Sequence, residues 1–240
     1  MANAVAIVGE SGSGKSTSLA QDSELGIIGL DPKETFIINV KDKPLPFRGW
    51  RKQYIPIPEL SQGPPTTGNY FASTDAQSII KVMQYIGSNR SDIKNIVLED
   101  MQYVMSQEFM DNALKSGFDK YNKLGKNMYD IINTGLHLPN DRNFIVLTHS
   151  DENEGKTSIK TIGKLLDDKV NLAGLFTIVL YTTVKTSMQG TTYSFVTNQH
   201  IDDRGTLLMA KSPRGMFEEK LIPNDLGYVL QKTEQYYSGE

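Results

Sequence analysis

Short apolar runs, each closed by glycine or by polar residues, recur along the chain and predict buried strands. The clearest are AVAIV (4–8), TFIINV (35–40), NIVLED (95–100) and NFIVLTHS (143–150), and GIIGL (26–30) is a weaker one. Runs that are rich in β-branched residues and apolar at nearly every position are typical of strands covered on both faces, as in a parallel sheet.

Residues with the spacing of a helix separate several of these runs. Asp75 is a good N-cap, and apolar residues then recur every three or four positions as far as Ile86. A second apolar stripe covers 121–136, and a final amphipathic helix is predicted to start within 223–225 and to end near Tyr237. Strands that alternate with helices indicate an α/β protein with a central, mostly parallel sheet flanked by helices.

The pattern changes in the second half of the chain. LFTIVLYTTV (175–184) and TTYSFVT (191–197) predict an antiparallel pair around Gln189-Gly190, so we expect an antiparallel C-terminal extension of the sheet. The charged segment DENEGKTSIKT (151–161) is interpreted as a loop, and 163–172 as a short helix.

A proline-rich segment interrupts the first half. Six of the ten prolines fall between Pro44 and Pro65, which excludes long helices there because proline lacks the backbone donor that a helix needs. We interpret about 41–72 as a β and loop excursion, with YIPI (54–57) as an edge strand. No linker or repeat divides the rest, so 1–240 is expected to form a single domain.

The stretch GESGSGKST is the most informative motif. It matches the phosphate-loop pattern G-x4-G-K-[ST] completely, after a predicted strand and before a predicted helix start. Its glycines let several backbone N–H groups point at one phosphate, Lys15 supplies a positive charge, and Ser16 offers a hydroxyl to Mg²⁺. The expected nucleotide-binding residues are Gly9, Glu10, Ser11, Gly12, Ser13, Gly14, Lys15, Ser16 and Thr17.

Two carboxylates end the third strand-like run. Glu99 and Asp100 follow Ile96-Val97-Leu98, and acidic groups at a neighbouring strand end are suited to hold Mg²⁺ and to polarise a water. Adjacent residues of a strand point in opposite directions, so the pattern does not fix the roles. By position we favour Glu99 for Mg²⁺ and Asp100 for the water. Acidic residues at a helix N-terminus are the simpler interpretation.

Polar residues also end the fourth run. Thr148 and His149 follow the apolar part of NFIVLTHS, where P-loop ATPases often carry a residue that senses the γ-phosphate. A structural hydrogen-bonding role for this histidine is the alternative.

Composition and charge limit the expected partners and cellular location of the protein. The net charge of −3 gives no global basic field that would attract nucleic acid, and there is no cysteine. No apolar run approaches the roughly 20 residues that a membrane span needs. We expect a cytoplasmic protein without a membrane partner.

The sequence lacks motifs that are typical of several classes of P-loop protein. There is no Asn-Lys-x-Asp guanine reader, no Leu-Ser-Gly-Gly before the carboxylate strand and no arginine-bearing lid cluster. These absences disfavour GTPases, ABC ATPases and small-molecule kinases, so ATP is the expected nucleotide. A strand pair after the third core strand favours the RecA-like branch.

The chain resembles the RecA-like ATPases encoded in bacteriophage replication and recombination clusters, which are similar to phage RecA-like single-strand annealing proteins. The resemblance is carried by the phosphate loop and by IVLEDMQYVM, THSDENEGK, KTIGKLLDDKV, GLFTIVLYTTV and AKSPRGMF. The group more often has Asp-Asp where Glu99-Asp100 stands here, which leaves the division of roles between these two residues open.

The resemblance implies an ATPase that acts with single-stranded DNA and phage recombination or replication proteins, in the host cytoplasm. It also implies a head-to-tail ring or filament, in which a basic residue of one subunit completes the site of the next. Lys211 and Arg214 are the candidates for this contact, and Arg204 is a weaker one. Surface charges beside a turn are the simpler interpretation.

A DNA-binding surface would need lysines and stacking aromatics. Lys156, Lys160 and Lys164 lie among acidic residues, and Tyr54, Tyr70 and Phe71 are the candidates for stacking. A charge-balanced, solvated loop is the alternative for the lysines. Two rival functions stay open: a nucleotide-gated adaptor or loader for a replication helicase, and a small-molecule or nucleotide kinase.

Overall fold

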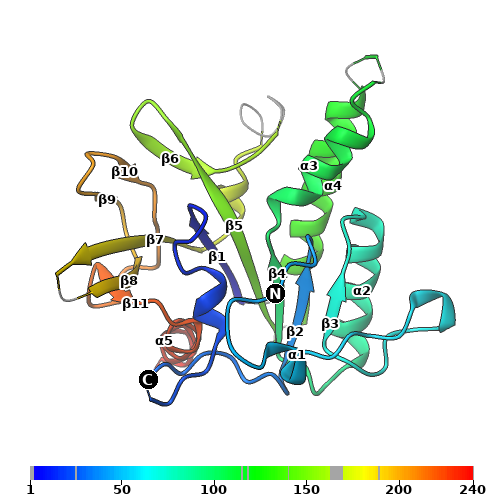
Figure 1. Ribbon diagram of the computed structural model, residues 1–240, viewed down its shortest axis with the longest axis horizontal. Helices are drawn as coiled ribbons and strands as arrows, with labels where there is room; N and C mark the ends of the chain where they lie inside the picture. Colours follow the sequence, from blue (N-terminus) through cyan, green and yellow to red (C-terminus); the bar gives the residue numbers. More distant parts are fainter. Residues whose placement is uncertain are drawn as a thin grey trace.

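A mostly parallel sheet forms the centre of the molecule (Figure 1). The structure is a computed structural model that describes residues 3–24, 26–114, 116–117, 119–139, 141–162, 170–188 and 190–239. The strands of the main sheet are β1 (Asn3–Gly9), β2 (Thr35–Asn39), β3 (Tyr70–Ala72), β4 (Asn95–Glu99), β5 (Asn143–Asn153), β7 (Ile178–Ser187), β8 (Gly190–Val196) and β11 (Leu221–Pro223).

The strand order is β11-β8-β7-β1-β5-β4-β2-β3. Every neighbouring pair from β7 to β3 is parallel, and β8 and β11 add antiparallel pairs at one side. These pairings confirm the expected α/β class, the mostly parallel sheet and the antiparallel part.

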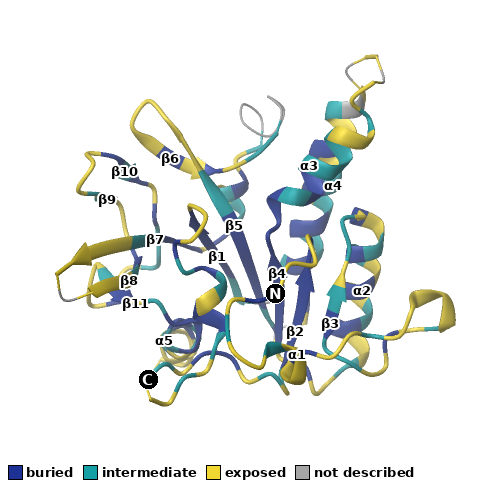
Figure 2. Cartoon of the chain, viewed as in Figure 1, coloured by how far each residue is buried: buried dark blue, intermediate teal, exposed yellow. Residues whose placement is uncertain are grey.

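Helices cover both faces of this sheet. One face packs against α2 (Ala76–Asn89), α3 (Gln102–Asp111) and α4 (Asp119–Leu136), and the other packs against α5 (Leu226–Ser238). Alternate residues of β1 illustrate the division, because Ala6 and Val8 join the first core and Val5 and Ile7 the second. β1, β2 and β4 are accordingly buried along most of their length, whereas the hairpin ends of β7 and β8 are exposed (Figure 2).

Parallel pairing brings the carboxyl ends of four strands to one edge. Gly9 at the end of β1 lies opposite His149 on β5, and Asn39 at the end of β2 lies opposite Glu99 at the end of β4. In open α/β sheets ligands bind at this edge, so the fold places the sequence-predicted residues where a site is expected.

An antiparallel arm extends from this edge. The expected charged loop at 151–161 is instead a hairpin, in which β5 continues to Asn153 and pairs with β6 (Lys156–Ile159). Two further short strands, β9 (His200–Ile201) and β10 (Leu207–Leu208), complete the arm. The reason is a period-two pattern inside KTSI, where Thr157 and Ile159 are buried and Lys156 and Ser158 are exposed.

Two other expected strands are absent from the described ranges. GIIGL forms an isolated bridge at Ile27 and then an irregular segment, because the backbone N–H groups of Ile28 and Gly29 donate to the Asp225 carboxylate. YIPI makes only an isolated bridge at Pro56, and β3 is the edge strand instead.

The remaining excursion contains two short helices, α1 (Trp50–Gln53) and η2 (Leu60–Gln62). Most of the helix expected at 163–172 lies outside the described residues, and η4 (Leu172–Leu175) follows it. Within the described ranges, no helix combines the length and the apolar character that crossing a membrane would require.

Candidate functional site

The segment between β1 and the following helix curls into a compact loop. Gly12 and Gly14 have φ angles of 77° and 91°, a region that side chains disfavour. Gly9 is required for a different reason, because a Cβ there would lie 1.7 Å from Thr182 Oγ1 on β7. Thr182 also donates a hydrogen bond of 2.7 Å to Ser13 Oγ, which ties the loop to the sheet.

The Lys15 ammonium lies at the head of the loop. Its Nζ donates to the backbone oxygens of Gly9 and Glu10, at 2.9 Å and 2.7 Å. Burial lowers the pKa of Lys15, whereas the charges of Glu99 and Asp100 raise it. The lysine is therefore a buried cation held by oxygens of its own loop, at the place where the motif would present a charge to a phosphate.

The element after the loop is shorter than the sequence predicts. The helix expected to open at Ser16 is the 3-10 helix η1 (Ser16–Leu19), and the chain is extended by Ala20. Asp22 and Ile27 then exchange two backbone hydrogen bonds that turn the chain back. A four-residue 3-10 helix aligns few peptide dipoles, so a phosphate bound here would interact mainly with the loop N–H groups and Lys15.

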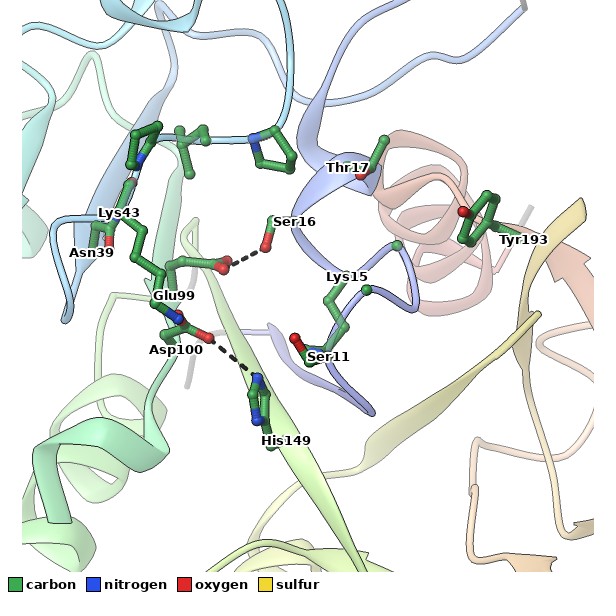
Figure 3. A pocket seen from close by; sticks show the side chains of 15 residues that line it. Ser11, Lys15, Ser16, Thr17, Asn39, Lys43, Glu99, Asp100, His149 and Tyr193 are labelled. Atoms are coloured by element: carbon green, nitrogen blue, oxygen red, sulfur yellow. Dashed lines mark hydrogen bonds and ion pairs between the residues drawn. The ribbon is translucent and has the colours of Figure 1, made fainter. Parts of the chain in front are cut away.

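Ser16 and Glu99 meet across the cavity (Figure 3). Ser16 Oγ donates to Glu99 Oε1 at 2.5 Å, and the other carboxylate oxygen, Oε2, is buried without a hydrogen-bond partner among the described residues. Burial raises the pKa of Glu99 to about 7; the Asp100 charge adds to the rise, and the Ser16 hydrogen bond and the Lys15 charge oppose it. An unpaired buried carboxylate oxygen is costly unless a cation or a donor meets it.

This pair fits Mg²⁺, which prefers oxygen ligands and is usually bound through one or two protein groups plus phosphates and waters. No group of three or more His, Asp or Glu side chains in the described ranges could hold a metal alone. Ser16 and Glu99 would therefore supply a hydroxyl and a carboxylate oxygen, and phosphate and water would supply the rest.

Asp100 faces the same cavity as Glu99, contrary to the expectation for adjacent strand residues. The strand ends at Glu99, and Asp100 has a left-handed backbone with φ of 61°, which redirects its side chain. Asp100 Oδ2 pairs with Lys43 Nζ at 2.7 Å, and Oδ1 lies 3.6 Å from His149 Nε2. The two carboxylates thus line one site with different partners.

Lys43 is a site residue that the sequence interpretation missed. Its ammonium lies 4.4 Å from the Tyr103 ring centroid as well as beside Asp100. Burial acts to lower the pKa of Lys43, but the hydrogen bond and the charge of Asp100 outweigh it and raise the pKa. The only signal in the sequence was its position four residues after the end of a core strand.

The end of β5 is organised by Gln102, which the sequence interpretation also missed. Gln102 Oε1 accepts from Thr148 Oγ1 and from the backbone N–H of His149, each at 3.2 Å, and its Nε2 donates to Asp100 at 3.4 Å. His149 lines the cavity, whereas Thr148 is fully buried and does not line it. Burial lowers the pKa of His149, and the Lys15 charge adds to the effect, which favours a neutral ring.

The cavity enclosed by these groups has a volume of about 250 Å³. It is lined by Ser11, Gly12, Gly14, Lys15, Ser16, Thr17, Asn39, Lys43, Pro44, Leu45, Pro46, Glu99, Asp100, His149 and Tyr193. Most of the predicted site residues are therefore brought together in one place (Figure 3).

The basic residues expected to act on a neighbouring subunit lie elsewhere. Lys211 forms a backbone bridge with Val179 on β7, and burial lowers its pKa. Arg214 is exposed, and neither residue lines the cavity of its own chain. Arg204 instead contacts its own phosphate loop, with Nη1 at 2.9 Å from Glu10 Oε1.

The expected stacking platform is largely wrong. Tyr54 and Tyr70 are 1% and 4% exposed and belong to the core, so they are not available to bases, whereas Phe71 is partly exposed. Lys156 and Lys160 are exposed on the arm, and Lys164 lies outside the described residues.

The site thus combines a sequence that matches the phosphate-loop pattern with a hydroxyl and two carboxylates at one edge of a mostly parallel sheet. No protein-family model matches the sequence, and no curated protein matches it. Among solved structures, the chain is similar to a KaiC-like protein from the hyperthermophilic archaeon Pyrococcus horikoshii OT3, with 8% identity and a TM-score of 0.45 over 85% of this chain and 89% of that chain. A likeness of this degree is weak, and the functional proposal rests on the site.

Proposed function

We propose that the chain binds and hydrolyses MgATP. The observation that carries the proposal is the hydrogen bond between Ser16 and Glu99 at the phosphate loop, with the other Glu99 oxygen buried and unpaired within the described part of the chain. A hydroxyl and a carboxylate in this arrangement are the protein ligands that P-loop NTPases use for Mg²⁺. The bound Mg²⁺ would neutralise charge on the β- and γ-phosphates.

The chain's own residues supply the other requirements. The N–H groups of the loop and Lys15 bind the phosphates. Asp100 orients the attacking water, because Glu99 is engaged with Ser16 while Asp100 faces the cavity beside His149. The water oxygen bonds to the γ-phosphorus as the bond to the bridging oxygen breaks, that electron pair leaves with ADP, and Asp100 accepts the proton. The neutral His149 ring makes a second contact, either with the attacking water or with the phosphate.

Calorimetry and phosphate release test the proposal together. Lys15→Ala should abolish measurable hydrolysis and weaken MgATP binding by at least about tenfold, because a charged hydrogen-bond donor is lost. Asp100→Asn should keep MgATP binding and slow hydrolysis by about 100-fold, as expected on losing a general base. Lys33→Ala, at an exposed turn away from the cavity, is the matched control. A folded wild-type chain that binds no adenine nucleotide with Mg²⁺ present would overturn the proposal.

From the resemblance to phage RecA-like ATPases, we further propose that the chain acts on single-stranded DNA and uses ATP hydrolysis to do so. It would work in a head-to-tail assembly, in which Lys211 or Arg214 of one subunit reaches the ATP site of the next. The exposed lysines of the arm support DNA contact, while the acidic residues beside them oppose it.

Adding single-stranded DNA to the ATPase assay separates the candidates. Stimulation that weakens steeply with salt supports DNA binding, because phosphate contacts release counterions. Phosphorylation of an added small acceptor without DNA stimulation indicates a kinase. Tight ATP binding with little turnover and a co-purifying protein indicates an adaptor or helicase loader. Activity regained by mixing Arg214→Ala with Lys15→Ala chains supports the contact between subunits.

A further inference from the structure

Lys43 has no role in the mechanism above, yet it lines the same cavity as the phosphate loop. We propose that Lys43 binds the terminal phosphate of ATP within its own chain and stabilises the charge that develops there during hydrolysis. This inference rests on the proposed ATPase function and assigns a further catalytic residue to it.

The backbone around Lys43 is fixed, while its side chain is partly exposed at the cavity. Asn39, at the end of β2 and 1% exposed, donates from Nδ2 to the Lys43 backbone oxygen at 2.8 Å. Pro44 and Pro46 follow and line the cavity with it, and proline restricts the backbone. The Lys43 side chain itself is 52% exposed. The fold therefore anchors the backbone of a partly exposed cation at the cavity wall.

Both lysines of the cavity have oxygen partners without nucleotide. Lys43 contacts Asp100, and Lys15 is held by loop carbonyls near Glu99. An entering triphosphate adds negative charge between these groups, so the Lys43 ammonium exchanges Asp100 for a phosphate oxygen. The exchange also frees an Asp100 oxygen to accept from the attacking water.

Lys43 takes no part in bond making. Water attacks the γ-phosphorus, the bond to ADP breaks with its electron pair on the leaving oxygen, and the proton goes to Asp100. Lys43 keeps its proton throughout and pairs with the oxygens of the transferring group, where a preorganised cation acts most strongly. The Tyr103 ring at 4.4 Å preorganises it.

Two substitutions test the charge separately from the packing. Lys43→Met keeps the apolar stem over Tyr103 but removes the charge, and should lower kcat by about 100-fold with little change in the Kd for MgADP. Lys43→Arg should retain activity within about tenfold of wild type. Lys41→Met is the matched control, because Lys41 lies 5.6 Å from the same ring, contacts Gln107 and does not line the cavity. It should behave as wild type.

A readout without turnover gives an independent answer. ADP with aluminium fluoride mimics the transferring phosphoryl group and should raise the melting temperature of the wild type beyond the rise given by MgADP. Lys43→Met should keep the MgADP rise and lose the additional one. If Lys43→Met keeps both, or if its melting temperature alone falls while kcat is retained, Lys43 is merely structural and the inference is wrong. A wild-type chain that responds to no nucleotide refutes the proposed function instead.

Mixing variants shows whether Lys43 acts within its own chain. Lys15→Ala and Lys43→Met chains should regain no activity when mixed, because each site lacks one of its own residues. Recovery on mixing would show that Lys43 reaches the neighbouring site and would overturn the assignment within one chain.

Discussion

At the scale of single residues, burial of Glu99 is the unusual feature of the site. Its side chain is 5% exposed, and one of its oxygens is unpaired in the described residues. Burial disfavours the ionised form, which is why the pKa is raised to about 7. A buried, ionised carboxylate destabilises the protein when no cation is bound, and a bound cation would remove that cost. Burial of Glu99 therefore explains both the loss of stability and the fit to Mg²⁺.

Because burying the ionised Glu99 carboxylate is unfavourable, we predict that the stability of the protein depends on pH when nucleotide and metal are absent. The pKa of Glu99 is about 7 in the folded chain and about 4.5 for an unperturbed glutamate. Between these two pH values the folded chain therefore binds one proton more than the unfolded chain. The stabilisation is complete below pH 4.5 and is lost as pH rises through 7, by about 3 kcal/mol in total. Glu99→Gln should therefore melt at a higher temperature than wild type at pH 8 in EDTA and close to it at pH 5. Equal melting temperatures at pH 8 would contradict the raised pKa.

Single residues also show what the sequence could predict about the site. Glu99 and His149 could be expected to lie near each other, because parallel register alone aligns the strand ends. The direction of the Asp100 side chain was not predictable, because it depends on one left-handed backbone angle. Lys43 contacts Asp100, and Gln102 contacts Thr148 and His149. Each of these contacts joins residues far apart in the sequence, and a single sequence does not show such contacts.

At the scale of elements, Asp225 joins two segments that are far apart in the sequence. Its buried carboxylate caps α5 by accepting from Gly227 and Tyr228, and it also accepts from Ile28 and Gly29 at 2.7 Å and 2.9 Å. The irregular segment after the phosphate loop is therefore held by a helix cap rather than by strand pairing.

We predict that Asp225→Ala costs more than the loss of an ordinary cap. Removing the carboxylate leaves the N–H groups of Ile28 and Gly29 without their acceptor in addition to uncapping α5, and should lower the free energy of unfolding by about 2–4 kcal/mol. Asp75→Ala, which removes only the bond to Ser78 at the start of α2, should cost about 1 kcal/mol. Urea unfolding measured by circular dichroism compares the two, and equal losses would contradict the double role.

Elements with a strong local pattern were predicted well, and those fixed by tertiary contacts were not. The caps of α2 and α5 and the β7–β8 hairpin are visible in residue types alone. GIIGL has the composition of a strand, but the Asp225 contacts override that preference. The arm at 151–161 was hidden because its charged residues suggested a loop, while two buried positions alternate inside it.

At the scale of the whole molecule, the site joins distant parts of the chain. The loop after β1, the ends of β4 and β5 and the segment after β2 all contribute to one cavity. The α/β class and the parallel sheet could be predicted because buried runs and helices alternate along the sequence. The position of the arm and the strand order depend on long-range pairing, which no local pattern specifies.

A ligand held by several core strands should stabilise the whole sheet rather than the loop alone. MgADP at about 100 times its Kd adds about 2.7 kcal/mol to the free energy of global unfolding. Amides in β1, β4 and β5 that exchange with solvent only through global unfolding should therefore slow by about 100-fold. Amides of β9, a two-residue strand at the edge of the arm, should exchange through local opening and change little. Hydrogen exchange with and without MgADP measures both, with Lys15→Ala as the control that lacks the effect. Slowing confined to residues 9–17 would mean that the nucleotide contacts the loop alone, and that Glu99 and Asp100 do not share its site.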